Sequence, residues 1–128
     1  MANPNIVGVV SIYAGNAAWA LTATVTTTLL TVSADVIVKV NSIIATNTHA
    51  TAATALTIDV NGIGTTVAGV TGTSLATTAK IASTINIPAD DILVVIDKPI
   101  YLMENDILRG GATSACDLFI SYEVINDA

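Results

Sequence analysis

The side chains best suited to acid–base or nucleophilic chemistry are scarce in this sequence. His49 is the only histidine and Cys116 is the only cysteine. Neither lies in a recognisable catalytic motif, because the sequence has no nucleophile elbow, no HExxH and no Gly-rich phosphate loop with its lysine. A catalytic histidine also needs a partner that orients it. We therefore interpret His49 as a loop residue and Cys116 as a small buried hydrophobe, and we assign no catalytic residue.

Acidic side chains gather around two expected turns: Asp90, Asp91, Asp97, Glu104 and Asp106. Carboxylate oxygens are the ligands that Ca²⁺ prefers, so these residues are candidate ligands of a calcium site. Their spacing matches no EF-hand loop, and aspartate favours turns because its side chain hydrogen-bonds to the local backbone. The turn interpretation is the simpler one, and we assign no metal ligand and no cofactor.

The aromatic side chains are few and far apart in sequence: Tyr13, Trp19, Tyr101, Phe119 and Tyr122. Sugar-binding modules stack a sugar on an exposed aromatic ring, and five scattered rings give no evident platform. We expect these rings to fill the core or a contact between subunits.

The sequence is poor in charge. Of its 128 residues, 52% are hydrophobic and only 11% are charged, against about 25% charged residues in a typical soluble domain. Thr, Ser, Asn and small apolar side chains must cover most of the surface, and uncharged patches of this kind commonly mark protein contacts. We therefore expect contacts between subunits; a monomer kept soluble by Thr hydroxyls is the alternative.

The charges that exist exclude several partners. The net charge is -6, and the four cations are spread along the chain: Lys39, Lys80, Lys98 and Arg109. Nucleic acid and anionic membranes need clustered cations, so we expect neither as a partner. The uncharged stretch before Asp35 lacks a cationic start and is interrupted by Ser, Asn and Thr, so we predict neither a signal peptide nor a membrane span. One cysteine allows no disulfide within the chain, which suits assembly in a reducing cytoplasm.

The local pattern favours strands. β-branched Thr, Val and Ile dominate, and apolar residues alternate with period two in 36–41, 56–60, 81–87 and 118–124. In 81–87 this pattern places Ile81, Ser83, Ile85 and Ile87 on one face. The run Ile92–Ile96 is apolar throughout, which predicts a central strand covered on both faces.

Turn signals separate these runs. Asn61-Gly62 predicts a two-residue hairpin, and further breaks are expected at 88–91, 97–99, 104–106 and 110–111. Residues 45–55 are expected to form a loop or a short helix. The sequence thus predicts one all-β domain over residues 1–128, an antiparallel β-sandwich that is jelly-roll-like, with about eight strands.

Four stretches resemble small virion structural proteins of tailed bacteriophages, especially those of cyanophages. They are residues 1–21 (MANPNIVGVVSIYAGNAAWAL), 36–47 (VIVKVNSIIATN), 85–111 (INIPADDILVVIDKPIYLMENDILRGG) and 118–125 (LFISYEVI). The resemblance covers most of the chain and implies a β-sandwich accessory protein, such as a head decoration or cement protein. It carries over no functional residue.

Composition and resemblance together predict a non-enzymatic virion protein that stabilises contacts between capsid shell subunits. Its expected partners are copies of itself, with a trimer favoured, and the major capsid protein or other virion proteins, assembled in the host bacterial cytoplasm. A neck, tail or fibre component is one alternative. A carbohydrate-binding β-sandwich adhesin is another.

The sheet edges need protection, because an unpaired edge invites further strand pairing. With so few charges, we expect neighbouring subunits to supply that protection. Thr24→Lys or Thr66→Lys is accordingly expected to weaken assembly more than folding.

Overall fold

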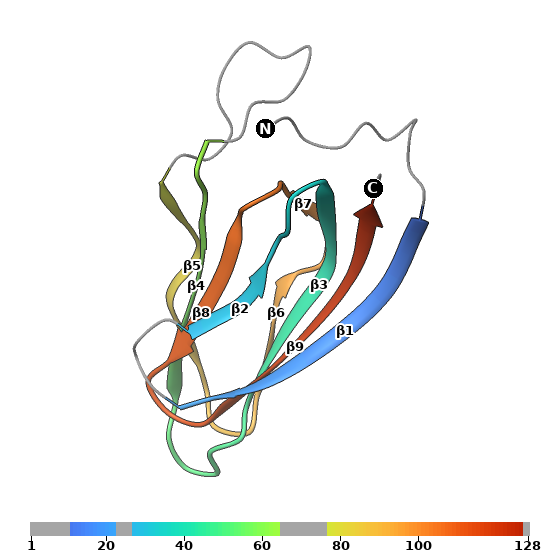
Figure 1. Cartoon of the computed structure of the whole chain (residues 1–128). Coiled ribbons are helices and arrows are strands. Elements are labelled where there is room, and N and C mark those ends of the chain that lie inside the picture. Colours follow the sequence, from blue (N-terminus) through green and yellow to red (C-terminus); the bar gives the residue numbers. More distant parts are fainter. Residues whose placement is uncertain (1–10, 23–26, 65–76, 127–128) are drawn as a thin grey trace.

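The chain folds almost entirely into strands. The structure, a computed structural model, describes residues 11–22, 27–64 and 77–126. They form nine strands (Figure 1): β1 (Ser11–Leu21), β2 (Thr27–Thr31), β3 (Val36–Asn47), β4 (Thr54–Asn61), β5 (Thr78–Ile87), β6 (Ile92–Ile96), β7 (Ile100–Leu102), β8 (Ile107–Ala112) and β9 (Cys116–Asn126). These residues form no helix that is long and apolar enough to span a bilayer. The predicted all-β class is confirmed, while Thr24 and Thr66 lie outside the described residues.

The strands form two antiparallel sheets. Sheet A has the order β1-β9-β3-β6, with β7 also paired to β3, and sheet B has the order β2-β8-β4-β5. β6 pairs with residues 43–46 of β3 and β7 with residues 38–40, so both lie along the same side of β3. Together they occupy one edge position. The described residues therefore form nine strands in eight positions, where the sequence predicted about eight strands.

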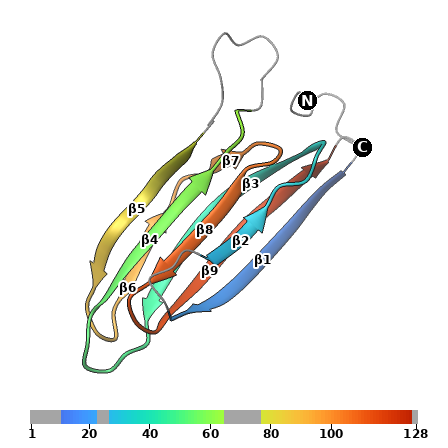
Figure 2. The same ribbon diagram turned by 60° about the vertical axis from the view of Figure 1, so that its left-hand side comes forward.

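The pairing is symmetric about the connection between β4 and β5. β4 pairs with β5, β3 with β6 and β7, β2 with β8, and β1 with β9. A long hairpin wrapped around itself into two sheets gives this pattern, which is the jelly roll. Figure 2 shows the two sheets face to face, with β1 along one side of the molecule. The first and last strands lie together, so that Ser11 is level with Asn126.

The core fills the space between the sheets. The expected alternation is confirmed in β3, β4 and β9, where Val40, Leu56 and Ile120 are completely buried. Ile43, Ile58 and Leu118 of the same strands join them, together with Leu108 of β8. Cys116 is also buried in this cluster, as predicted.

The prediction for Ile92–Ile96 is wrong. β6 is an edge strand, and only its inner residues pack on the core, while Ile92 is 59% exposed and Val94 is 51% exposed. A continuous apolar run therefore does not mark a strand covered on both faces here. It marks a strand whose outer face is apolar and open.

The alternation expected in 81–87 is also wrong. The inward residues of β5 are Ala82 and Ile87, while Ile81 and Ile85 are 36% and 40% exposed. Two register shifts against β4 cause the change, one on each side of Ile58. An extra residue in one strand moves every later side chain to the other face.

Two predicted turns are wrong and the others are confirmed. Asn61 pairs with Thr78, so no two-residue hairpin follows it. The pair Gly110-Gly111 lies inside β8, where a Cβ on Gly110 would lie 3.0 Å from Leu29 Cδ1. These glycines therefore fit close packing and not a turn. Of residues 45–55, only 48–53 form a loop, which has no helix, while 45–47 belong to β3 and 54–55 to β4, against the prediction. The breaks at 88–91, 97–99 and 104–106 separate strands as expected.

Candidate functional site

The outer face of sheet A carries an apolar row across four strands. Ala18 of β1 is level with Phe119 of β9, Phe119 with Ile44 of β3, and Ile44 with Val94 of β6. Their chain neighbours Leu118, Ile43 and Ala45 point into the core, so the row points outward. Phe119 is 45% exposed. We call these four residues, Ala18, Phe119, Ile44 and Val94, the apolar row.

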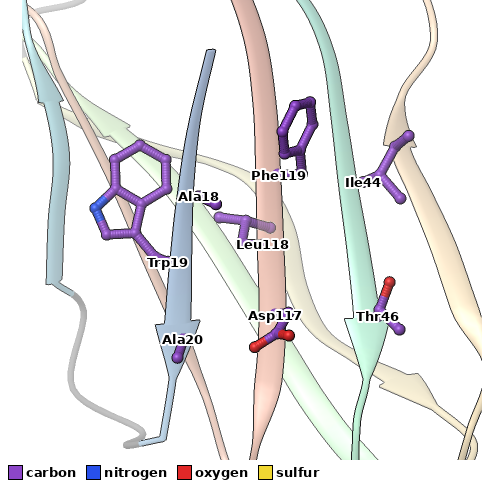
Figure 3. A pocket seen from close by; sticks show the side chains of 8 residues that line it. All are labelled: Ala18, Trp19, Ala20, Ile44, Thr46, Asp117, Leu118 and Phe119. Atoms are coloured by element: carbon purple, nitrogen blue, oxygen red, sulfur yellow. The ribbon is translucent and has the colours of Figure 1, made fainter.

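A shallow depression adjoins the apolar row. Its volume is about 350 Å³, and it is lined by Ala18, Trp19, Ala20, Ile44, Thr46, Asp117, Leu118 and Phe119. Figure 3 shows Phe119 and Ile44 on one side, with Asp117 and Thr46 below them and Trp19 beside β1. One carboxylate and one hydroxyl among apolar groups make no acid–base pair. The arrangement suits binding, because apolar surface gains most from being covered.

The rest of this face is mixed in character. Glu123, Lys39 and Tyr101 lie level with one another on β9, β3 and β7, and Tyr101 is half exposed. Near the start of β1, exposed Ile12 is level with Ile125. Hydrophobic side chains thus reach the outer surface along most of sheet A.

The outer face of sheet B is polar instead. Thr28, Arg109, Asp59 and Lys80 lie level with one another across its four strands. Arg109 donates to Asp59 through two atoms, with Nε 2.7 Å from Oδ1 and Nη2 3.1 Å from Oδ2. Such a forked pair satisfies the buried carboxylate of Asp59. The two faces of the sandwich therefore differ, because a polar row crosses all four strands of sheet B, whereas an apolar row crosses sheet A.

His49 has a structural role in the loop between β3 and β4. Its Nδ1 accepts hydrogen bonds from the N–H groups of Thr51 (3.2 Å) and Ala52 (3.1 Å). Beside it, the buried Asn47 donates through Nδ2 to the carbonyls of Ala52 and Ile87 and accepts from the N–H of His49. The interpretation of His49 as a loop residue agrees with these contacts.

The acidic residues considered for calcium do not converge. Across 11–22, 27–64 and 77–126, no three His, Cys, Asp or Glu side chains form a group that could hold a metal ion. Asp90, Asp91 and Asp97 are exposed in turns. The side chain of Asp91 accepts from the N–H of Ile92 at 2.8 Å, as the turn interpretation predicts.

Sequence reasoning missed the burial of two acids in the turn between β7 and β8. Glu104 Oε2 accepts from the N–H of Asp35 at 3.0 Å, and Asp106 Oδ2 accepts from the N–H of Met103 at 3.0 Å. Burial raises the pKa of Asp106, and the Met103 bond lowers it by less. Backbone bonds from Val32 to Asp106 and from Asn105 to Val32 complete the link to the β2–β3 turn.

The aromatic residues divide between core and surface. Trp19 and Tyr122 pack against the core, while Tyr13, Tyr101 and Phe119 are exposed by 61%, 50% and 45%. The expectation of core or subunit contact is therefore met in the core by Trp19 and Tyr122, and for the three exposed rings the subunit contact stays a prediction.

Comparison with known proteins gives loose structural likenesses. No family model matches the chain, and no curated protein matches it. A solved structure of Bacillus endospore appendages that form disulfide-linked pili is 14% identical, with a TM-score of 0.49, over 92% of this chain and 88% of that one. The infectious bursal disease virus VP2 subviral particle is 16% identical, with a TM-score of 0.46, over 91% of this chain. Infectious bursal disease virus of the Gt strain gives 12% identity and a TM-score of 0.25. This chain spans 33% and 37% of the two viral chains.

Proposed function

We propose that this protein is a non-enzymatic structural subunit of a bacteriophage particle, most simply a capsid decoration or cement protein. Its partners would be copies of itself, with a trimer favoured, and the major capsid protein or other virion proteins. The observation that carries the proposal is the apolar row, which a lone molecule leaves in contact with water. The resemblance of the sequence to phage virion proteins supplies the setting, the virion assembled in the host cytoplasm.

Burial of charge strengthens this argument. Three of the chain's acids, Asp59, Glu104 and Asp106, are buried in the described residues, so the surface holds fewer charges than the sequence implies. A surface of this kind costs little to desolvate when another protein covers it. In a decoration protein, the outer face of sheet A would lie against a neighbouring copy or the shell.

The proposal is tested by placing a charge in the apolar row. We expect Phe119→Lys and Val94→Lys to shift the protein to lower mass in light scattering at equal concentration, because a contact over this face would bury an unpaired charge. Both side chains point outward, so the free energy of unfolding should change by less than about 1 kcal/mol. Asn86→Lys, on the outer face of sheet B, is the matched control and should assemble like the unchanged protein.

A wild-type protein that stays monomeric at every concentration and does not bind phage heads would contradict the proposal. The place in the particle needs a separate measurement. Antibody labelling of intact virions should show many copies over the head for a decoration protein. A few copies at one vertex would indicate the neck, tail or fibre alternative.

A carbohydrate-binding adhesin is a second candidate, favoured by the depression beside the apolar row. It places Phe119 beside the carboxylate of Asp117 and the hydroxyl of Thr46. Aromatic rings with nearby hydrogen-bonding groups are what sugar recognition requires. Specific binding on a glycan array that is lost in Phe119→Ala would support this function, and an array without binding would remove it.

A further inference from the structure

The two sheets have four edges, and three of them are protected against further pairing. β5 carries two register shifts, a positive φ of 49° at Thr84 and the exposed Lys80. β2 and β6 have only five residues each, and each contains a register shift. Charged residues and Pro99 flank β6. Short strands, bulges, charges and prolines are the devices that keep sheet edges from pairing.

The fourth edge, β1, has none of these devices. It runs for 11 residues, pairs with β9 without a register shift, and contains no charged residue and no proline. At about 3.4 Å per residue, it presents an edge about 37 Å long. Among the described strands only β9 pairs with it, and Figures 1 and 2 both show its other side open. On that side, the N–H and C=O groups of every second residue point away from β9 and can pair with another strand.

We propose that β1 pairs antiparallel with β1 of a second copy, across a two-fold axis at Asn16, and joins the two A sheets. This proposal rests on the self-association in the proposed function and deepens it, with a two-fold contact between two copies that is distinct from a contact within a trimer. A second copy is a suitable partner because β1 itself is a long, uncharged strand without a register shift. Antiparallel pairing of identical strands is self-complementary, as a two-fold contact requires.

The register at Asn16 uses the full length of both strands. It places Tyr13 of one copy level with Trp19 of the second and Ala14 level with Ala18. Tyr13 is 61% exposed in the single molecule, and this contact gives it an aromatic cross-strand neighbour. The small side chains at Ala14 and Ala18 let the strands approach on the outer face.

The charges on β9 are compatible with this arrangement. Glu123 is level with Ala14, and Asp117 is level with Ala20. Across the axis, Ala14 is level with Ala18 of the second copy, so Glu123 lies in one cross-strand row with Phe119 of the second copy. In the same way, Asp117 lies in one row with Ile125 of the second copy. Carboxylates of the two copies therefore never face each other, despite the net charge of -6.

A cysteine at the axis tests the contact directly. Cys116 is buried, so Asn16→Cys introduces one accessible thiol that would face its own copy within disulfide reach. Under mild oxidation we expect a disulfide-linked dimer to form at least tenfold faster than from Asn86→Cys, an exposed strand position on sheet B. Equal rates for the two variants would overturn the proposal.

A charge exchange at the same position tests the register. Like charges directly opposite each other destabilise a strand pair, so Asn16→Lys alone and Asn16→Asp alone should each weaken dimer formation. An equal mixture of the two variants should restore it. If the oligomers of both single variants have the same mass as the wild-type oligomer, the β1 contact is wrong while the proposed function stands. A wild-type protein without any self-association would contradict both.

Discussion

Asp106 holds a carboxylate in a place that disfavours its charge. Because burial raises its pKa in the folded protein, the native state binds more protons than the unfolded chain between the ordinary value of 3.8 and the raised one. The stabilising contribution is complete below that window and is lost as pH rises through it. Asp106→Asn should therefore gain stability relative to the wild type with rising pH. Denaturant unfolding of both proteins from about pH 3 to about pH 7 measures this difference, in which all other groups cancel. A difference that is constant with pH would contradict it.

The turn at Asp106 could be predicted from the sequence, but its burial could not. Asn105 and Asp106 indicate a turn because both residue types favour turns through hydrogen bonds to the local backbone. This preference depends only on neighbouring residues. Burial depends on Val32 and Asp35, which lie far away in sequence and reach this turn only through the fold. The same holds for Asn47, whose partners lie on the β5–β6 side of the molecule.

At the scale of the strand, Gly15 determines how closely β1 lies on β9. A Cβ at Gly15 would come within 2.8 Å of the ring of Tyr122, its cross-strand partner. Gly15→Ala is expected to lower the free energy of unfolding by about 1–3 kcal/mol through overpacking. In a Tyr122→Ala background the same change should cost less than about 0.5 kcal/mol, which a double-mutant cycle measures. Ala14→Ser, on the outer face of β1, is the control, and equal costs in both backgrounds would be the contrary result.

Strands were predictable where one face is buried and the alternating stretch itself contains no extra residue, since the register shifts of β4 against β5 place their extra residues in β5 and that of β3 against β9 follows Val40. The alternation in β3, β4 and β9 follows from their inner faces, which pack in the same core. It failed in β5 because its register shifts depend on the partner strand and leave no local signal. The prediction failed for β6 because an apolar run has the same sequence pattern whether the outer face of the strand is covered by another layer of this chain or is exposed. The apolar row was for that reason invisible in the sequence.

For the whole molecule, an apolar contact and an ionic contact predict opposite responses to salt. If copies meet through the apolar row, ammonium sulfate should strengthen association, and warming from about 5 °C to about 30 °C should strengthen it as well. A contact held by ion pairs would weaken, because about 0.15 M salt already screens charges beyond roughly 8 Å. Light scattering over a salt series and a temperature series distinguishes the two. Weaker association in high salt would contradict the apolar contact.

The pairing of the first strand with the last also sets an order of events during synthesis. β1 leaves the ribosome early, whereas its partner β9 follows roughly a hundred residues later, which takes about 5–20 s at ordinary elongation rates. Throughout that interval β1 lacks its native partner strand. The nascent chain therefore exposes the edges of β1 for nearly the whole of translation. Neighbouring chains on one messenger RNA could pair through β1 before either chain is complete.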